Sequence, residues 1–304
     1  MSIYIDSCPQ STPVDNLPPY RGPVIDFRTS APVTGSLDVQ WHAGWPSPKH
    51  DPAAEIQVHV YSEHTVILRQ NKSVHFEAPF LFLLFGNERA LLLDTGATSD
   101  PAYFPLRATV DALIEQWLAR HPRSGYGLVV AHTHGHSDHI AGDPQFADRP
   151  HTEVVGPSLG EVREFFGLTD WPDGGAELDL GGRVLDVVPG PGHQEAAVVF
   201  HDRHTGLLLT GDSLYPGRLY VQDTEVFAAT VDRLLAFCET TPVTHVLGCH
   251  IEMTRTPDED YPRGTTHQPD EPALQLTTAH LRRLRDALAE RRTHSGDFIV
   301  VYRD

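Results

Sequence analysis

Residues 131–143 read AHTHGHSDHIAGD and contain the pattern His-x-His-x-Asp-His at His134, His136, Asp138 and His139. In an extended turn, His134 and His136 point the same way and can hold one cation. Asp138 and His139 follow as the chain curls into a helix, so they can face a second cation nearby. With 19 His in 304 residues, a chance match anywhere in the chain is expected at below about one per cent. The stretch therefore predicts a metal site.

Further ligand-type residues lie outward from this stretch, each at the end of a predicted strand or turn. The apolar run GLVVAH (127–132) predicts a short buried strand that leads into the His-rich turn. Downstream come His193 in PGPGH, Asp212 in LLLTGDSLYPG and His250 in VLGCHIE, and upstream Asp94 ends LLLDTG. Imidazoles and carboxylates together form a nitrogen–oxygen donor set that suits Zn²⁺, and also Fe or Mn.

This ordered set of motifs resembles the metallo-β-lactamase fold superfamily, over roughly residues 55–255. The resemblance implies an α/β protein built as an αββα four-layer sandwich, with a binuclear metal site along one edge of its two sheets. In the ligand set that it implies, His134, His136 and His193 hold the first metal, Asp138, His139 and His250 hold the second, and Asp212 bridges both.

The resemblance also assigns roles beyond the ligands. Asp94 would anchor the His-rich turn by hydrogen bonds rather than bind metal. Zinc lowers the pKa of bound water to about 7, so a metal-bridging hydroxide would attack the substrate, and Asp138 would carry a proton to the leaving group. Tyr215 matches a tyrosine of the family's lactonases that assists the substrate carbonyl, so we expect its hydroxyl to donate to the developing oxyanion. The alternative for Tyr215 is a pocket-wall residue.

Within the superfamily, the pattern is similar to the glyoxalase II and N-acyl homoserine lactonase branches. We therefore expect a hydrolase that uses two Zn²⁺ to cleave an ester, lactone or thioester of a small molecule. Glyoxalase II has a larger helical C-terminal domain for glutathione, whereas only 54 residues follow His250 here. Two alternatives stay open: an iron-dependent persulfide or sulfur dioxygenase with one iron, and a phosphodiesterase.

Charge and composition limit the partners. The chain has 23 Lys and Arg against 41 Asp and Glu, a formal net charge of −18. Nucleic acids and anionic membrane surfaces both need basic protein surfaces, so neither is an expected partner. Three Cys indicate a reducing compartment, and the N-terminal residues lack a signal-peptide pattern, so we predict a cytoplasmic protein. A homodimer is an open possibility.

Proline separates a first segment from the rest. Residues 1–52 hold nine of the 25 Pro, which predicts a coil-like extension packed on the core, with the catalytic domain spanning 53–304. Within the extension, Ile25, Phe27 and Trp41 can dock on a core, as can Trp45. The alternative for the two Trp is an acyl pocket.

Hydrophobic periodicity predicts strands interleaved with helices in the remainder, which is the order of a layered α/β domain. We expect an edge strand at 298–302. The other predicted strands are 56–61, 64–70, 80–86, 89–96, 127–132, 183–188, 196–201, 206–211 and 243–248, and the predicted helices are 106–118, 158–166, 226–239 and 273–290.

Several residues near the motifs have two interpretations each. Arg218 and Tyr220 follow Asp212 closely and either contact substrate or serve the structure, Arg218 through a salt bridge. His132 is expected to be a satisfied core histidine, because its side chain alternates with that of His134. Cys249 is expected to point away from the metals. The segment 254–272 is either a lid over the site or a surface connection.

Overall fold

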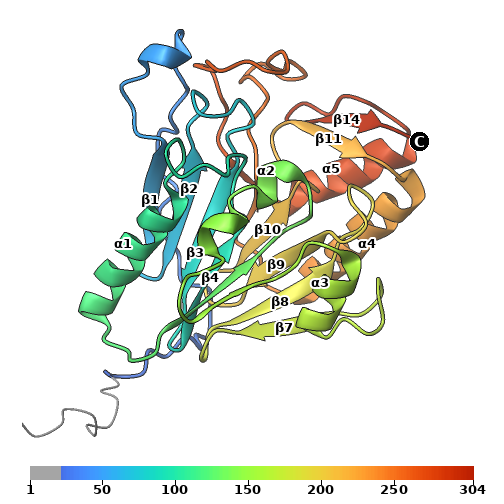
Figure 1. The fold of residues 1–304 in the computed structure, drawn as a ribbon. Coiled ribbons are helices and arrows are strands. Elements are labelled where there is room, and N and C mark those ends of the chain that lie inside the picture. Colours follow the sequence, from blue (N-terminus) through green and yellow to red (C-terminus); the bar gives the residue numbers. More distant parts are fainter. Residues whose placement is uncertain (1–21) are drawn as a thin grey trace, which may run out of the picture.

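The computed structural model describes residues 22–304. The prolines within residues 1–21, which support part of the predicted extension, lie outside the described residues. Figure 1 shows two sheets packed face to face with helices on their outer faces. Within the described part of the chain, no helix is both long and apolar enough to cross a bilayer.

Sheet 1 has six strands in the order β1-β2-β3-β4-β5-β6. The first four strands form an antiparallel meander, and β5 and β6 then add in parallel after helical crossovers. Parallel neighbours place their carboxyl ends at one edge, which is where α/β proteins build their sites. The strands are β1 (Ile56–Ser62), β2 (Thr65–Gln70), β3 (Phe80–Phe85), β4 (Arg89–Leu93), β5 (Gly127–Ala131) and β6 (Thr152–Val154).

Sheet 2 also has six strands, in the order β13-β12-β10-β9-β8-β7. A separate two-stranded parallel sheet joins β11 to β14. The strands are β7 (Ala176–Asp179), β8 (Val184–Pro189), β9 (Val198–Asp202), β10 (Leu207–Gly211), β11 (Arg218–Val221), β12 (His245–Gly248), β13 (Gln275–Leu276) and β14 (Ile299–Tyr302).

Side-chain hydrogen bonds fix where two of the helices begin. Ser158 and Glu161 form a reciprocal capping box at the start of α3, and the Asp223 side chain accepts from the Val226 N–H at the start of α4. Gly167 ends α3 in the left-handed conformation. The helices are α1 (Leu106–Arg120), α2 (Ser137–Ile140), α3 (Leu159–Phe166), α4 (Thr224–Thr240) and α5 (Thr278–Ala289), with 3₁₀ turns at Pro48–His50 and Asp143–Phe146.

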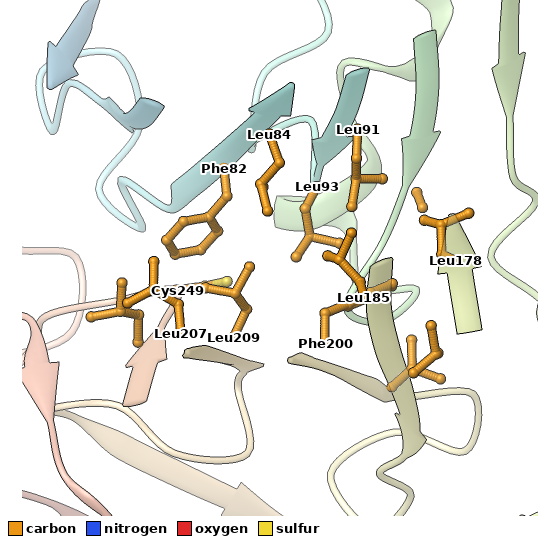
Figure 2. Close-up of a cluster of buried hydrophobic side chains, with 14 of the residues drawn as sticks. Phe82, Leu84, Leu91, Leu93, Leu178, Leu185, Phe200, Leu207, Leu209 and Cys249 are labelled. Atoms are coloured by element: carbon orange, nitrogen blue, oxygen red, sulfur yellow. The ribbon is translucent and has the colours of Figure 1, made fainter. Parts of the chain in front are cut away.

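The central core lies between the two sheets. Side chains alternate along a strand, so every second residue of β3 and β10 faces the other sheet. Phe82 and Leu84 from β3 meet Leu207 and Leu209 from β10 in one buried cluster, as Figure 2 shows. These strands are apolar on both faces, which explains why their sequences read as continuous apolar runs rather than alternating ones.

The intervening residues of the same strands face the helices. Leu83 of β3 packs with Trp117 of α1 on the outer face of sheet 1. Leu208 of β10 packs with Leu234 of α4 and Leu284 of α5 on the outer face of sheet 2. Three buried clusters therefore separate four layers, and the predicted αββα sandwich is confirmed.

The sequence predictions differ from the structure mainly in short elements. The predicted helix 273–290 is wrong at its start, because α5 begins only at Thr278. Leu274 is instead buried between the sheets, and β13 follows it. The segment 298–302 pairs with β11 rather than with a six-stranded sheet. The strands β6, β7, β11 and β13 have only two to four residues each, too few to show a period.

The described part of the extension packs against sheet 1. Phe27 and Trp41 are buried, whereas Trp45 is exposed. Asn87, beside β4, exchanges two hydrogen bonds with the backbone of Ile25, and the Ser36 N–H donates to the carbonyl of Tyr61 in β1. The division into an extension at 1–52 and a catalytic domain at 53–304 stays a prediction.

Candidate metal centre

All seven predicted ligands lie where strand ends of the two sheets meet. The His-rich turn follows β5, and Asp138 and His139 lie in the short helix α2, as the sequence suggested. His193 lies between β8 and β9, Asp212 directly follows β10, and His250 follows β12. The structure brings these residues together as two donor groups: His134, His136 and His193 in the first, and Asp138, His139, Asp212 and His250 in the second.

The first donor group consists of three imidazoles whose nitrogens converge. His136 Nδ1 lies 3.0 Å from both His134 Nε2 and His193 Nε2, and these two Nε2 atoms lie 3.3 Å apart. With zinc–nitrogen bonds of 2.0–2.1 Å, the edges of a tetrahedral site are about 3.3 Å long. The spacing of the three nitrogens therefore fits one shared cation.

The second donor group mixes imidazole and carboxylate. His250 Nε2 lies 3.4 Å from His139 Nε2, 3.4 Å from Asp138 Oδ2 and 3.3 Å from Asp212 Oδ1. His139 Nε2 lies 3.4 Å from Asp138 Oδ2 and 3.5 Å from Asp212 Oδ1. These separations also match the edges of a four-coordinate site.

Asp212 lies between the two groups. Its Oδ1 faces His139 and His250, whereas its Oδ2 lies 3.6 Å from His193 Nε2 and 3.9 Å from His134 Nε2. Oδ1 is buried and has no hydrogen-bond partner. A buried carboxylate oxygen without a donor is costly, and a cation in the second group would stabilise it.

The outward nitrogens of three histidines fix which way their lone pairs point. A backbone carbonyl can only accept, so we assign an N–H to Nδ1 of His193, which donates to Tyr220 O at 2.8 Å, and of His250, which donates to Glu77 O at 3.0 Å. His139 Nδ1 likewise lies 2.9 Å from Asp94 Oδ2. In its neutral form, each ring then directs an Nε2 lone pair into the cluster. Converging lone pairs repel one another unless a cation lies between them, so the donor set fits metal ions.

Asp94, for which we predicted an anchoring role, is completely buried below the His-rich turn. Its Oδ1 accepts from the Thr133 N–H at 2.8 Å. Its Oδ2 accepts from the Thr133 hydroxyl, from His139 Nδ1 and, at 3.3 Å, from the Cys249 thiol. The backbone of Asp94 is left-handed, with φ of 66°. One carboxylate thus joins the end of β4 to the turn and to the residue before His250.

Two ligands are preceded by glycines that their backbone geometry requires. Gly192, before His193, has φ of 123°, and a Cβ there would lie 2.5 Å from the backbone of Phe227. Gly211, before Asp212, has φ of 52°, and a Cβ there would lie 2.6 Å from Thr133. Only glycine permits these conformations and close approaches together. Gly211 thus brings the end of β10 against the His-rich turn, and Gly192 lets the loop that carries His193 pack against α4.

The local electrostatics separate the two groups. Burial, with His139 close by, holds the pKa of His134 well below its usual value. Burial also acts to lower the pKa of His139. The carboxylates of Asp212, Asp94 and Asp138 outweigh this effect and raise the pKa of His139 well above its usual value. The pKa of Asp212 stays well below its usual value because His250 and His139 outweigh burial. An ionised Asp212 among imidazoles favours a positive charge in this cluster.

A cavity of about 320 Å³ opens beside the donor groups. Both groups reach it, so a bound substrate would touch the metals directly. Among the ligands, the cavity is lined by His136, Asp138, His193, Asp212 and His250, and its other lining residues are Glu77, Ser137, Tyr215, Tyr220, Gln222, Glu252, Arg263 and Arg303.

Of the residues predicted around the metals, Tyr215 and Tyr220 line this cavity. The Tyr215 hydroxyl donates to the backbone carbonyl of Arg218, and its ring lies 5.4 Å from that of His250. Its role as a donor to the oxyanion stays a prediction. Arg218 does not line the cavity, and its guanidinium pairs with Glu252 and Asp260. Of the two predicted roles of Arg218, the structure therefore supports the structural salt bridge.

Other candidates lie away from the cavity. His132 is buried and belongs to neither donor group, as predicted, but the prediction that it is satisfied is wrong, because neither ring nitrogen has a hydrogen-bond partner within the described residues. Its Nε2 lies 3.1 Å from a carboxylate oxygen of Asp143. Cys249 points into the core between the sheets. Trp41 packs edge-on against Phe80, so this side chain docks the extension on the core and does not line an acyl pocket. Trp45 likewise does not line the cavity.

The segment 254–272 is a surface connection that also reaches the cavity, and its role as a lid stays a prediction. Its backbone pairs with the extension, through a bridge between Gly44 and His267 and a hydrogen bond from Gln268 N–H to Ala43 O. It also contributes Arg263 to the cavity wall.

Sequence reasoning missed four residues that matter to the geometry. Glu77 holds His250 through a backbone carbonyl, which no sequence pattern reports. Thr133 lies inside the motif between two histidines, so its position was a usable signal. Arg263 lies in a segment that the sequence singled out, but Arg303 lies 53 residues beyond His250 and had no signal of its own.

Comparison with known proteins agrees with this geometry. Residues 77–292 match the family model of the metallo-beta-lactamase superfamily. The chain belongs to this superfamily. The match includes all seven residues of the two donor groups and ends before β14.

Curated members of the superfamily with similar sequences include two named hydroxyacylglutathione hydrolase. The protein from Rhizobium meliloti is 28% identical over 170 residues, which cover 54% of this chain and 63% of that protein. The protein from Aeromonas salmonicida is 27% identical over 179 residues, which cover 56% of this chain and 66% of that protein. The chain thus spans less than two thirds of the length of these relatives.

Solved structures of the superfamily share the fold. The DIM-1 metallo-beta-lactamase aligns with a TM-score of 0.51 at 14% identity, covering 79% of this chain and all of that one. A metallo-beta-lactamase from Pontibacter korlensis aligns with a TM-score of 0.50 at 18% identity, covering 77% of this chain and 99% of that one. Similarity at this level shows the architecture and leaves the reaction to the residues of the site.

Proposed function

We propose that this protein is a metal-dependent hydrolase that cleaves an ester, lactone or thioester bond of a small molecule, with two metal ions bridged by Asp212. The observation that carries the proposal is the position of Asp212, whose two oxygens face two separate donor groups. The relatives named hydroxyacylglutathione hydrolase support a hydrolytic reaction.

Zinc is the metal that we propose, and Fe or Mn would also suit the donors. The cluster offers five imidazoles and two carboxylates and no thiolate, since the Cys249 thiol donates to Asp94. Such a donor set is borderline in hardness and suits zinc. When bound, two zinc ions supply a nucleophilic water of lowered pKa and polarise the substrate carbonyl.

Asp138 is the residue that we propose as the proton carrier. Its carboxylate lines the cavity, and its pKa lies far below the usual value because His139 and His250 outweigh the effect of burial. It is therefore ionised before the reaction, and we propose that it accepts a proton from the attacking water as that water bonds to the substrate. The same carboxyl group can then pass the proton to the leaving oxygen or sulfur.

Tyr215 is the proposed donor to the developing oxyanion. Its buried hydroxyl has a pKa well above the usual value, because burial and the nearby Glu252 and Asp212 oppose ionisation, so it keeps its proton. In the structure this proton is donated to the carbonyl of Arg218. Catalysis by Tyr215 requires this hydrogen bond to be exchanged for one to substrate.

Metal content per chain, measured on protein purified without added metal, tests the proposal first. Two zinc ions per chain, followed by turnover of lactone, ester or thioester substrates, would support it. One iron per chain, with oxygen consumption on addition of a persulfide, would instead identify a dioxygenase. Preferential turnover of phosphodiesters would identify a phosphodiesterase.

His136→Ala tests the first donor group directly. Loss of one of three imidazoles should reduce the bound metal and lower kcat/KM by at least about a hundredfold. His151→Ala is the matched control, because His151 is exposed and belongs to neither donor group. Unchanged metal content and rate in His136→Ala would refute the ligand assignment.

A further inference from the structure

The extension lies against the segment 254–272, which reaches the metal cavity. A β-bridge joins Gly44 to His267, and the Gln268 N–H donates to the carbonyl of Ala43. Figure 1 shows the two segments side by side. The family model matches residues 77–292, so the extension lies outside the part of the chain that matches the family. Its contact with a segment of the cavity wall therefore needs an explanation.

The backbone at Gly44 makes this contact a close one. Gly44 has φ of 77°, a conformation that favours glycine. A Cβ at this position would lie 1.9 Å from the carbonyl oxygen of Thr266, far inside the ordinary van der Waals distance. Any side chain larger than that of glycine would therefore force the extension and the segment 254–272 apart.

Buried charges hold the end of the segment to sheet 1 and to the extension. Glu271 accepts two hydrogen bonds of 2.7 Å from the guanidinium of Arg69 in β2, and Lys72 Nζ lies 3.2 Å from the same carboxylate. Arg69 also donates to the carbonyl of His42 at 3.2 Å. All three charged side chains are at most 7% exposed, so losing one partner would be costly. One arginine thus joins strand, extension and segment.

The segment also contacts the loops of the metal centre through Arg218. Asp260, within the segment, accepts from the guanidinium of Arg218 at 2.5 Å. The carbonyl of Arg218 accepts from the Tyr215 hydroxyl, and Tyr215 lines the cavity. Arg218 also begins β11, whose Tyr220 carbonyl accepts from Nδ1 of the ligand His193. A continuous set of contacts therefore runs from the extension to a cavity-lining tyrosine and to a metal ligand.

We propose that the extension completes the cavity as a positioning element: its residues 42–44 hold the segment 254–272 in place, and the segment, through Arg218, holds the loop of Tyr215. The inference rests on the proposed function only where turnover is measured. Contacts transmit an effect between two regions only if disturbing one region changes the other. An extension that merely covered sheet 1 could be loosened without any change at the cavity, so loosening it is the test.

Gln57→Ala loosens the extension from β1 and removes no hydrogen bond to the segment. The Gln57 side chain donates to the carbonyl of Gln40 and accepts from the N–H of His42. It does not line the metal cavity. Loss of the two hydrogen bonds should speed amide hydrogen exchange about tenfold in the segment 254–272 and in residues 213–222. Mass spectrometry of the full chain with its metals bound measures both stretches.

Val58→Ala is the matched control for this variant. Val58 is the next residue of β1, and its side chain is 43% exposed and apolar, so it forms no hydrogen bond to the extension. Exchange in both stretches should therefore match that of the wild type. Equal acceleration in Val58→Ala and Gln57→Ala would overturn the proposal, because it would reflect a general weakening of β1.

Gly44→Ala disturbs the contact directly. The clash with Thr266 should speed exchange in both stretches by more than Gln57→Ala does. Gly125→Ala is its matched control, since Gly125 has φ of 65° and a Cβ there would meet no atom within 4 Å. If Gly44→Ala does not fold, Gln57→Ala, at a half-buried surface position, still decides. Unchanged exchange in both stretches, or faster exchange confined to the segment 254–272, would overturn the proposal.

Kinetics separate this inference from the proposed function. With the lactone, ester or thioester that turns over fastest, Gln57→Ala and Gly44→Ala should each lower kcat/KM by about threefold to tenfold. Metal content should stay at the wild-type value, and the two controls should keep the wild-type rate. Faster exchange with an unchanged kcat/KM would overturn the positioning role. If no substrate turns over but exchange rises in both stretches, the hydrolase proposal alone fails.

A double-mutant cycle tests the route through Arg218. Asp260→Asn weakens the contact between the segment and the Arg218 guanidinium. Because Gly44→Ala should act through that same contact, the two changes together should lower kcat/KM by less than the product of their separate effects. Gly125→Ala combined with Asp260→Asn should give the full product. Fully multiplicative effects of Gly44→Ala and Asp260→Asn would overturn the proposed route.

Discussion

The two ends of the sheet sandwich both bury charged side chains, but they stabilise them differently. At the end remote from the cavity, Arg183 and Asp202 are fully buried and joined by two hydrogen bonds, of 2.6 and 3.0 Å. Arg183 also donates to Thr65 of β2 and to the carbonyl of Phe85 in β3, so it links the two sheets. The chain itself supplies every partner for the buried charge at this end.

At the metal end, the chain leaves the buried charge incomplete. Asp212 is 7% exposed, yet its Oδ1 has no hydrogen-bond donor, and three imidazole nitrogens converge nearby. The comparison separates a structural ion pair from a binding site. Breaking a buried carboxylate–guanidinium pair leaves an uncompensated charge and destabilises the fold, whereas a carboxylate beside converging nitrogen lone pairs favours an added cation. A substitution at the metal end should therefore mainly reduce metal binding, whereas a substitution at the remote end should mainly reduce the free energy of unfolding.

The largest effect is expected for Asp212→Asn. The amide cannot place two anionic oxygens between the donor groups, so both metals should be lost and kcat/KM should fall at least about a thousandfold, or about 4 kcal/mol. Metal analysis and steady-state kinetics check this. Loss of one metal alone would argue against a bridging role.

Asp202→Asn should show the reverse pattern. Leaving the buried Arg183 without its charged partner should lower the free energy of unfolding by about 3 kcal/mol or more. Urea denaturation measures that loss, and metal content per folded chain should stay unchanged. If metal content fell as much as in Asp212→Asn, the two ends would not be independent.

The same pair predicts a pH dependence. Burial acts to raise the pKa of Asp202, but Arg183 outweighs it and holds that pKa below its usual value. A depressed folded-state pKa adds stability above the unfolded value, about 4, and loses it as pH falls through the folded value. Acid should therefore destabilise the wild type more steeply than Asp202→Asn. Equal acid sensitivity would contradict this.

Asp94→Asn should have an intermediate effect on metal binding. An amide nitrogen in place of Oδ2 would face the N–H of His139 and the Thr133 hydroxyl, so the His-rich turn should lose its orientation. Groups that orient ligands contribute about tenfold to a hundredfold in metal affinity. Competition with a chromogenic chelator measures it. Cys249→Ala is the control, since it removes the weak thiol contact to the same carboxylate, together with some core packing, and leaves the Asp94 oxygens in place.

The smallest effect is expected for Tyr215→Phe, because this change removes neither a metal ligand nor the group that orients one. Loss of the hydroxyl that we propose as donor to the oxyanion should lower kcat by about tenfold to a hundredfold. Loss of the buried hydrogen bond to the carbonyl of Arg218 should also cost about 1 kcal/mol of stability. Kinetics and thermal denaturation measure the two effects separately. A change in kcat of less than about threefold would contradict the donor role and leave the hydrogen bond to Arg218 as the use of the hydroxyl.

The same contrast explains what the sequence could predict. Four of the ligands are closely spaced between His134 and His139, and the other three each follow a predicted strand or turn. Periodicity and the motif together therefore located the ligands in the sequence. Apolar strands such as β3 and β10 were recognisable because they are buried on both faces. Periodicity predicted a layered α/β domain, and the four-layer fold was implied by the resemblance that the motifs carry.

The cavity walls were less predictable for a physical reason. Arg303 reaches the cavity only because β14 pairs with β11, which is a long-range contact between two four-residue strands. Glu77 acts through its backbone, which carries no side-chain signal. Leu274 looked helical because its spacing matched that of Leu281, yet burial between the sheets determined its conformation instead.

Each sheet is built from one contiguous half of the chain, sheet 1 from residues 56–154 and sheet 2 from residues 176–276. The first donor group combines residues from both halves, because His134 and His136 belong to the first half and His193 to the second. A cation bound by these three residues would act as a cross-link between the halves. Metal binding would then be a late step in folding, because the site forms only after the two halves dock. Removal of the metal by a chelator would in turn weaken the docking of the halves, because the bound metal stabilises the docked state by mass action.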